Sequence, residues 1–277
     1  MIIDSHQHFW NPARGDYDWM PKGDPILDRI YRPGDLVGAL VRHQIDGTVL
    51  VQAAATVAET EYMLGLADGS DFVQGVVGWV DFETPSDVKV LERLKGHPKF
   101  KGVRPMIQDI PDDDWMLRGD VQWGYAALAD LDLSLDALGF PRHLANFLTI
   151  LKRYPTLRTV IDHCMKPQIR DHSEANFTFW AEGMARLAGE TGAYVKFSAL
   201  ITEANPDWTV EALRPYVAHI LKVFGPARVM WGSDWPVCRL RAEYGGWLGA
   251  ARQLTAHLSV PDQKLVYGGA AEEFYRL

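Results

Sequence analysis

Cysteine is scarce in this sequence, which holds only Cys164 and Cys238 among 277 residues. Two cysteines cannot form the disulfide framework of a small secreted domain, and so low a number suits a reducing compartment. No apolar run approaches the roughly 20 residues of a membrane-spanning helix. Asp4 also interrupts the first apolar segment before it could form the core of a leader peptide. We therefore expect a cytoplasmic protein with no membrane contact.

Positive charge is also in short supply. Lysine and arginine number 28 against 36 aspartates and glutamates, which gives a formal net charge of -8. This balance disfavours a nucleic-acid backbone or an anionic membrane as a partner. An anionic small ligand stays open, because the local field in a pocket can oppose the net charge. We expect a small-molecule partner, and the sequence leaves open whether the chain forms a homo-oligomer.

Short apolar segments alternate with helical patterns along the chain. Eight segments have the length and composition of buried strands: 2–5, 48–52, 73–80, 102–106, 133–137, 159–162, 194–198 and 228–232. Alternating strands and helices indicate a parallel sheet, and eight such units predict closure into a (β/α)8 TIM barrel of the α/β class, with residues 1–277 as a single domain. The alternative is a doubly wound open sheet, but the glycine-rich first turn typical of that fold is missing.

Capping signals and two long connections refine this picture. Thr56 and Glu59 have the spacing of a capping box, and Gly192 and Gly225 stand where helices should end. The segments 9–32 and 107–119 lack clear periodicity. Because the loops that follow barrel strands surround the active site, we expect both segments to overhang it.

Polar side chains alternate within the first apolar segment. Asp4, His6 and His8 point to one side of an extended chain. His163 follows the sixth predicted strand and Asp234 follows the eighth. In a closed barrel the carboxyl ends of the strands meet at one mouth, so His6, His8, His163 and Asp234 are predicted to form a shared site.

Four motifs, "DSHQHFW", "VIDHCMKP", "VKFSAL" and "WGSDWP", resemble the amidohydrolase superfamily, and specifically its amidohydrolase-2 branch, which includes sugar lactonases such as L-fuconolactonase and L-rhamnonolactonase. The resemblance covers nearly the whole chain in matching order. It implies a (β/α)8 fold, hydrolysis of a carbonyl substrate, and a site built from the first-strand histidine pair, the sixth-strand histidine and the eighth-strand aspartate.

The sequence departs from the two-metal members of that superfamily. Those members are similar in using a carboxylated lysine on the fourth strand and a histidine on the fifth, whereas this chain has Arg104 and Asp136 there. We therefore expect no bridged metal pair and no obligatory cofactor. One divalent ion, zinc or manganese, remains compatible with the side chains at the site. The predicted ligands for such an ion are His6, His8, His163 and Asp234.

Lactone hydrolysis needs a base for the attacking water and donors for the developing oxyanion. Asp234 is the predicted general base and later the acid that protonates the leaving alkoxide. His6, His8 and His163 are predicted to supply N–H donors, unless a metal takes that role as a Lewis acid. The sequence does not assign these roles among the histidines. Cys164 is excluded as a nucleophile because its alternation places it on the opposite face from His163.

Six further residues are candidate substrate contacts: Arg104, Lys196, Gln52, Trp79, Trp10 and Trp235. Each has a structural alternative, since an arginine or lysine inside a barrel also pairs with carboxylates and tryptophans also fill cores. Three functions stay open. The first is opening of a small aldonolactone, and the second is hydrolysis of a carboxylated lactone such as 2-pyrone-4,6-dicarboxylate, or a metal-dependent decarboxylation. The third is a catalytically silent binding barrel.

Overall fold

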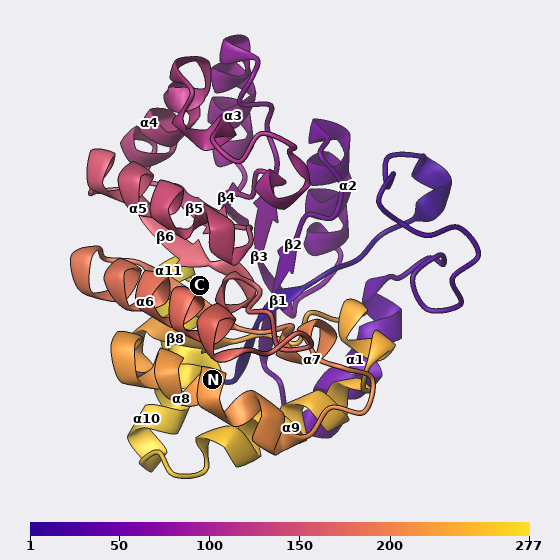
Figure 1. The fold of residues 1–277 in the computed structure, drawn as a ribbon. Helices are drawn as coiled ribbons and strands as arrows, with labels where there is room; N and C mark the ends of the chain where they lie inside the picture. The colour runs from indigo at the N-terminus through magenta and orange to yellow at the C-terminus, as the bar shows by residue number, and fades with distance from the viewer.

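Eight parallel strands form a barrel surrounded by helices in the computed structural model, which describes residues 1–277 (Figure 1). The strands pair in chain order: β1 (Ile3–Gln7), β2 (Gly47–Val51), β3 (Val73–Gly78), β4 (Phe100–Val103), β5 (Ser134–Ala137), β6 (Arg158–Ile161), β7 (Tyr194–Phe197) and β8 (Val229–Trp231). The predicted (β/α)8 barrel is thus confirmed and the open-sheet alternative is wrong. The observed strand ends differ from the predicted ones by a few residues.

Helices cover the outside of the barrel. They are α1 (Pro33–His43), α2 (Val57–Asp68), α3 (Val88–Lys95), α4 (Gln122–Asp130), α5 (Leu144–Arg153), α6 (Glu174–Glu190), α7 (Leu200–Glu203), α8 (Val210–Phe224), α9 (Tyr244–Thr255), α10 (Val260–Lys264) and α11 (Ala270–Tyr275). The apolar faces of α5 and α8 are buried. Gly225 ends α8 at a φ of 71°, a left-handed value that glycine adopts without a steric penalty.

Only one of the two hydrogen bonds of the predicted capping box is present at the start of α2. The Thr56 hydroxyl accepts a hydrogen bond from the Glu59 N–H at 3.1 Å. The Glu59 carboxylate does not return to Thr56 but accepts from the N–H groups of Ala53 and Ala54, at 3.0 and 2.6 Å. Glu59 therefore holds the loop that follows β2, on the side of the barrel where the strands end.

The barrel closes between β1 and the segment after β8. The Asp234 N–H donates to the His6 carbonyl at 2.8 Å, and the His8 N–H donates to the Trp235 carbonyl at 2.7 Å. The buried Asp4 carboxylate accepts from the Ser233 N–H at 2.7 Å. These contacts hold the residues that follow β8 against the first strand. Residues from the first and the last strand of the barrel therefore meet at one site.

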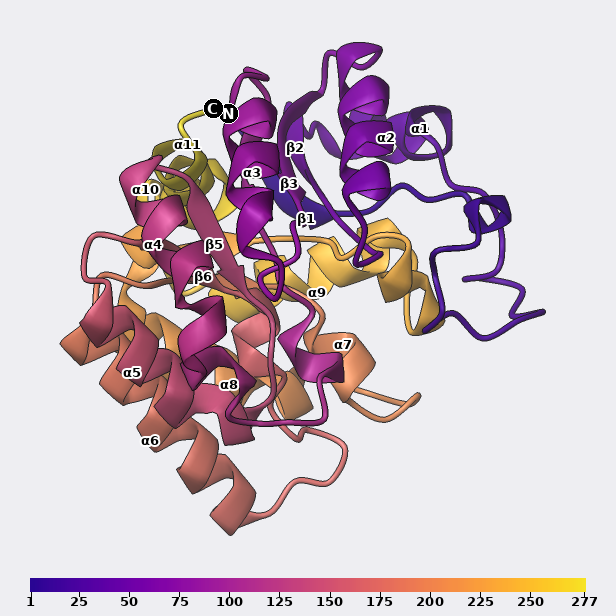
Figure 2. The ribbon, with the colours of Figure 1, turned by 90° about the horizontal axis from the view of Figure 1, so that it is seen from above.

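The far end of the barrel is plugged by the last helix. Side chains of α11, including Phe274 and Tyr275, form a buried apolar cluster with inward-facing residues of the strands. The start of the chain contacts α11, since the N-terminal ammonium is 3.6 Å from the Glu272 carboxylate; Figure 2 shows both chain ends on the side of the barrel where α11 lies. No helix is long and apolar enough to span a bilayer.

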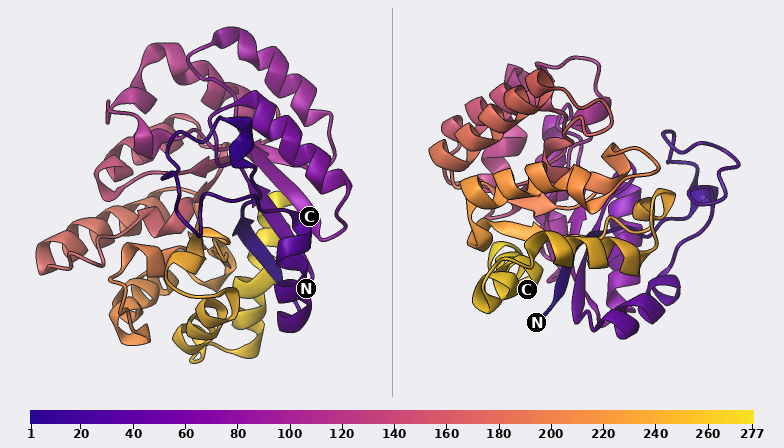
Figure 3. Two further views of the ribbon diagram at one scale, coloured as in Figure 1. Left: turned by 90° about the vertical axis from the view of Figure 1, so that its right-hand side faces the viewer. Right: turned by 60° about the horizontal axis from the view of Figure 1, so that its bottom comes forward.

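The two long connections lie at the mouth of the barrel, as predicted. The segment between β1 and α1, coloured indigo, extends as an irregular loop beside and over the strands (Figure 3). It is held by the Trp10 indole, which donates to the Leu27 and Arg29 carbonyls at 3.1 and 3.0 Å. The segment after β4 contains three short 3-10 helices within residues 107–121.

Candidate active site

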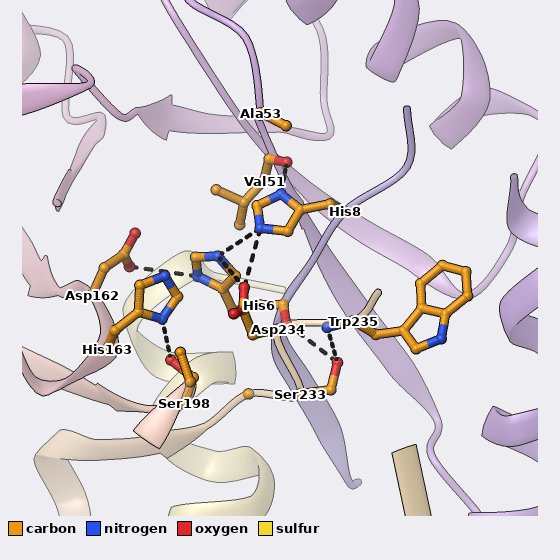
Figure 4. A network of polar contacts seen from close by, with 12 residues as sticks. His6, His8, Val51, Ala53, Asp162, His163, Ser198, Ser233, Asp234 and Trp235 are labelled. Atoms are coloured by element: carbon orange, nitrogen blue, oxygen red, sulfur yellow. Dashed lines mark hydrogen bonds and ion pairs between the residues drawn. The ribbon is translucent and has the colours of Figure 1, made fainter. Parts of the chain in front are cut away.

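Two histidines, His6 near the end of β1 and His8 directly after it, meet at the centre of the mouth. Nε2 of His6 and Nε2 of His8 lie 3.1 Å apart, and both rings are buried (Figure 4). Nδ1 of His8 donates to the Val51 carbonyl at 2.7 Å. Burial, and then the charge of Lys196, hold the pKa of His6 well below its usual value. The His6 imidazole is therefore neutral at pH 7.

His163 reaches the same cluster from a left-handed turn. Residues 163–166, which follow β6 after Asp162, all have φ between 48° and 59°. Such values cost non-glycine residues roughly 1 kcal/mol each. The turn directs His163 inward, where its ring centroid lies 4.5 Å from that of His6 and its Nδ1 lies 2.9 Å from the Ser198 hydroxyl. Burial lowers the pKa of His163 to about 3, so this ring is also neutral.

Asp234 completes the cluster three residues after β8. Its φ is 55°, and its carboxylate turns toward the histidines, with Oδ1 3.3 Å from Nε2 of His8 and 3.7 Å from Nε2 of His6. Burial opposes ionisation, but the interactions with His163 and His8 outweigh it and leave the pKa of Asp234 below its usual value. The carboxylate is ionised at neutral pH and can accept a proton.

Arg104 follows β4 and borders the cluster. Its guanidinium donates to the Gln52 carbonyl, to the Gln52 side chain at 2.9 Å and to Asp162 at 3.2 Å. Nη1 also lies 3.4 Å from Nε2 of His6. Most donors of Arg104 are thus used within the protein, and Gln52 acts on the site by holding Arg104.

Beneath the cluster lies a fully buried group of charges. The Lys196 ammonium pairs with Asp136 and lies 3.0 Å from Oδ1 of Asp162 and 3.1 Å from Nδ1 of His6. Burial raises the pKa of Asp136 to about 6. Burial also opposes the ionisation of Asp162, but Lys196 and His6 reverse this effect and hold its pKa well below the usual value. The structural alternative for Lys196, an inward lysine paired with acids, is the observed one.

A pocket of about 310 Å³ opens above the cluster. Of the predicted site residues, five line it: His8, Trp10, Arg104, His163 and Asp234. His6, Gln52 and Lys196 lie behind this lining.

Two predicted substrate contacts lie elsewhere. Trp79 lines a separate, mostly apolar pocket beside Trp115. The indole of Trp235 points away from the histidines (Figure 4) and packs against Phe9 and Tyr31, with ring centroids 6.0 and 4.9 Å away. Alternation along a short segment could not separate a tryptophan that faces the pocket from one that faces the core.

Several residues that line the pocket were not predicted from the sequence. The remaining lining residues are Trp19, Ala53, Met106, Gln108, Asp109, Leu138, Lys166 and Val237. Trp19, Gln108 and Asp109 belong to the two connections that were expected to overhang the site, so a signal for their region existed. Lys166 stands three residues after His163 within a motif already singled out, but the left-handed turn that brings it to the pocket has no sequence signature.

A divalent cation would find suitable donors at this site. One ring nitrogen each of His6 and His163 and one oxygen of Asp234 lie within 4.8 Å of one another. Imidazole and carboxylate are ligand types that zinc and manganese accept. His8, the fourth predicted ligand, lies outside this group of three, although its Nε2 is close to His6 and Asp234.

Comparison with known proteins agrees with the fold. Residues 3–277 match the amidohydrolase family model. The chain is 42% identical to an L-fucono-1,5-lactonase of Burkholderia ambifaria, over 99% of this chain and 95% of that protein. It is 33% identical to an L-fucono-1,5-lactonase of Burkholderia multivorans, over 99% and 96% of the two chains. A zinc-bound crystal structure of an amidohydrolase from Burkholderia multivorans superposes with a TM-score of 0.94 at 31% identity, over 100% and 99% of the chains. The chain therefore belongs to the amidohydrolase family.

Proposed function

We propose that this protein hydrolyses a small sugar lactone, with L-fucono-1,5-lactone as the first candidate substrate. The observation that carries the proposal is the ionised Asp234 carboxylate, which faces the pocket beside three imidazoles. The relatives named as L-fucono-1,5-lactonases, similar over almost the full chain, support the same substrate class. The reaction breaks the ring ester bond and adds one water to give an open-chain aldonic acid.

Asp234 acts as the general base in this proposal. Its carboxylate accepts a proton from the water as the water oxygen attacks the lactone carbonyl. The protonated Asp234 then gives this proton to the ring oxygen as the carbon–oxygen bond breaks. The low pKa of Asp234 keeps the base in its reactive form across the neutral range.

Donors around the base stabilise the negative charge that develops on the carbonyl oxygen. Arg104 and the imidazole N–H groups of the cluster are fixed by Gln52, Val51 and Ser198 before substrate binds. Preorganised donors of this kind contribute a few kcal/mol each to catalysis. The indole of Trp10 on the pocket wall offers an apolar face for the C–H surface of the sugar ring.

The charges of the pocket favour a neutral lactone over a dicarboxylate. Arg104 and Lys166 are the lysine and arginine side chains in the lining, and Arg104 is already paired with Asp162. A dianionic substrate would therefore find one cation, Lys166, that is not hydrogen-bonded to a carboxylate, although Glu203 lies 4.0 Å from it, together with the repelling charges of Asp109 and Asp234. For this reason the pyrone dicarboxylate and decarboxylase alternatives are the weaker proposals.

A divalent ion, zinc or manganese, binds in this proposal to His6, His163 and Asp234 without being required for turnover. When bound, the ion would act as a Lewis acid toward the lactone carbonyl. The donor types and their spacing fit such an ion. The zinc-bound structure of the Burkholderia multivorans amidohydrolase supports zinc as a candidate ion.

The proposal is tested by a pH-indicator assay that follows acid release from a panel of lactones. The panel contains L-fucono-1,5-lactone, other aldonolactones and 2-pyrone-4,6-dicarboxylate, and each is assayed before and after treatment with a chelator. We expect turnover of a neutral aldonolactone that survives chelation. Hydrolysis of the dicarboxylate alone would overturn the substrate class, and loss of activity on chelation with recovery on adding zinc would overturn the metal-independent mechanism.

A further inference from the structure

Lys196 has an unusual place for a lysine. It projects from β7 into the barrel interior, with no exposed surface, below the floor of the pocket. An ammonium group has three N–H donors and no acceptor. Lys196 has three acceptors around it, namely Asp136, Asp162 at 3.0 Å and Nδ1 of His6 at 3.1 Å. The ammonium thus donates hydrogen bonds to Asp136 and to Nδ1 of His6, and Asp162 is a close ion-pair partner.

We propose that Lys196 is a positioning residue that fixes the proton of His6 on Nε2. A neutral imidazole carries one proton, on either Nδ1 or Nε2. Because the ammonium can only donate, Nδ1 of His6 must accept from Lys196, and the ring proton is left on Nε2. Oδ1 of Asp162 could instead accept from Nδ1, but it lies 3.5 Å away, at the limit of a hydrogen bond, while Lys196 is at 3.1 Å.

The other contacts of the His6 ring are compatible with this assignment. Nε2 of His6 lies 3.1 Å from Nε2 of His8 and 3.7 Å from Oδ1 of Asp234, a carboxylate that can accept its proton. Nη1 of Arg104 also faces Nε2 and can only donate, but it is farther away, at 3.4 Å, than Lys196 is from Nδ1, at 3.1 Å. Lys196 is thus the nearer of the two cations that face this ring, and a proton on Nδ1 would point directly at its ammonium N–H.

The tautomer has consequences for the site, which rest on the proposed lactonase function. The Nε2 proton of His6, behind the pocket lining, is directed toward His8 and Asp234, which border the pocket. The same proton blocks Nε2 as a metal ligand, since a metal binds the bare nitrogen. Binding of a divalent cation through Nε2 of His6 would require the proton to move to Nδ1, toward an ammonium that offers another N–H. Lys196 therefore favours the donor role of His6 and weakens metal binding.

The first test measures the tautomer of His6 in the unaltered protein. Nitrogen-15 NMR of histidine-labelled protein distinguishes a protonated from a bare ring nitrogen, and the His6→Gln variant identifies the His6 signals. We expect a neutral His6 with its proton on Nε2 at pH 7. A proton on Nδ1 would overturn the inference. This measurement does not depend on turnover, so an inactive protein with the expected tautomer would refute the lactonase proposal and leave the role of Lys196 intact.

The second test removes the cation. In Lys196→Met the Asp162 carboxylate becomes the only partner of Nδ1, so the proton should move to Nδ1. The affinity for zinc, measured by competition with a chromophoric chelator, should then rise at least about tenfold, since every 1.4 kcal/mol is tenfold in affinity. Lys99→Met is the matched control, because Lys99 is also hydrogen-bonded but to the Ala67 and Ser70 carbonyls away from the site. A folded Lys196→Met protein with an unchanged tautomer and unchanged zinc affinity would contradict the proposal, and the spectrum of the unaltered protein decides the matter if the variant does not fold.

Discussion

At the scale of single residues, the site depends on backbone conformations that aim side chains inward. Asp234 and His163 both have positive φ, at 55° and 54°. Strain at such positions persists only where the surrounding structure enforces it, and it concentrates at functional sites. The Asp234 N–H is held by the His6 carbonyl at 2.8 Å, so the base and its neighbouring imidazole are positioned by one main-chain hydrogen bond.

Asp234→Asn should abolish most of the activity without unfolding the protein. The amide has nearly the same shape but cannot accept the water proton, so kcat on an aldonolactone should fall by roughly 10²–10⁴-fold, the usual contribution of a general base. Asp109→Asn is the control, because Asp109 also lines the pocket but lies on its exposed rim. Steady-state kinetics check the pair. Equal kcat values for Asp234→Asn and the unaltered protein would refute the mechanism.

Lys166 should contribute to substrate binding. Its ammonium lines the pocket, and its nearest carboxylate, that of Glu203, is 4.0 Å away, beyond hydrogen-bond distance. The ammonium is therefore free to donate to a lactone oxygen. Lys166→Met should raise KM roughly tenfold or more, since hydrogen bonds to charged groups contribute about 1.5–3 kcal/mol. Lys166→Arg should retain most of the binding. A KM that stays unchanged in Lys166→Met as well would exclude a contact between Lys166 and the substrate.

The sequence indicates polar residues on strands better than residues on irregular turns. Alternation along β1 was enough to place His6 and His8 on one face, since the period of a strand is fixed. Lys166 was missed because its position depends on four consecutive left-handed residues, none of which is glycine. The residue types in such a turn do not indicate its left-handed backbone conformation, because the surrounding fold imposes that conformation.

At the scale of elements, loops at the mouth are fixed by the helices that follow them. The start of α2 holds the loop after β2 through Glu59, and the Ala53 carbonyl of that loop accepts from the Trp19 indole at 2.6 Å. The capping signal Thr56–Glu59 correctly marked the helix start. Sequence spacing could not show that Glu59 binds the preceding loop, because that choice depends on where β2 delivers the chain.

Thr56→Ala should destabilise the fold by about 1 kcal/mol, the typical cost of losing an N-cap. The Thr56 hydroxyl accepts from the Glu59 N–H and donates to the Asp16 carboxylate at 2.9 Å, so the cap also ties the N-terminal loop to α2. Thr56→Ser keeps both hydrogen bonds and should stay within a few tenths of a kcal/mol. Urea unfolding measures the free energy of unfolding of both variants. An equal decrease in Thr56→Ala and Thr56→Ser would show that the threonine methyl group, and not the hydroxyl cap, stabilises the fold.

At the scale of the whole molecule, the fold was readable because eight short strands alternate with helical segments along the chain. Each strand is short and buried on both sides, so it appears as an apolar segment. The plug formed by α11 was not predicted. Tyr275 donates from that helix to Asp136 at 2.7 Å, a contact between the end of the chain and the centre of the barrel that no local pattern reveals.

Burial of ionisable groups also makes the stability of the whole fold depend on pH. Burial raises the pKa of Glu59 from 4.5 to about 7 in the folded state. Below pH 4.5 the carboxyl is protonated in both the folded and unfolded states. As pH rises toward 7 the unfolded state ionises first, so the folded protein loses stability, by about 3 kcal/mol at most for a shift of this size.

Glu59→Gln removes this ionisation and keeps an oxygen that can accept from the Ala53 and Ala54 N–H groups. The free energy of unfolding of Glu59→Gln, relative to that of the unaltered protein, should therefore rise between pH 4.5 and about 7 and level off above that range. Urea unfolding at a series of pH values measures this difference. Glu92→Gln, on the exposed face of α3, should show no such trend. A difference that stays constant with pH would mean that Glu59 is ionised in the folded barrel at its ordinary pKa, with the two N–H groups compensating fully for its burial.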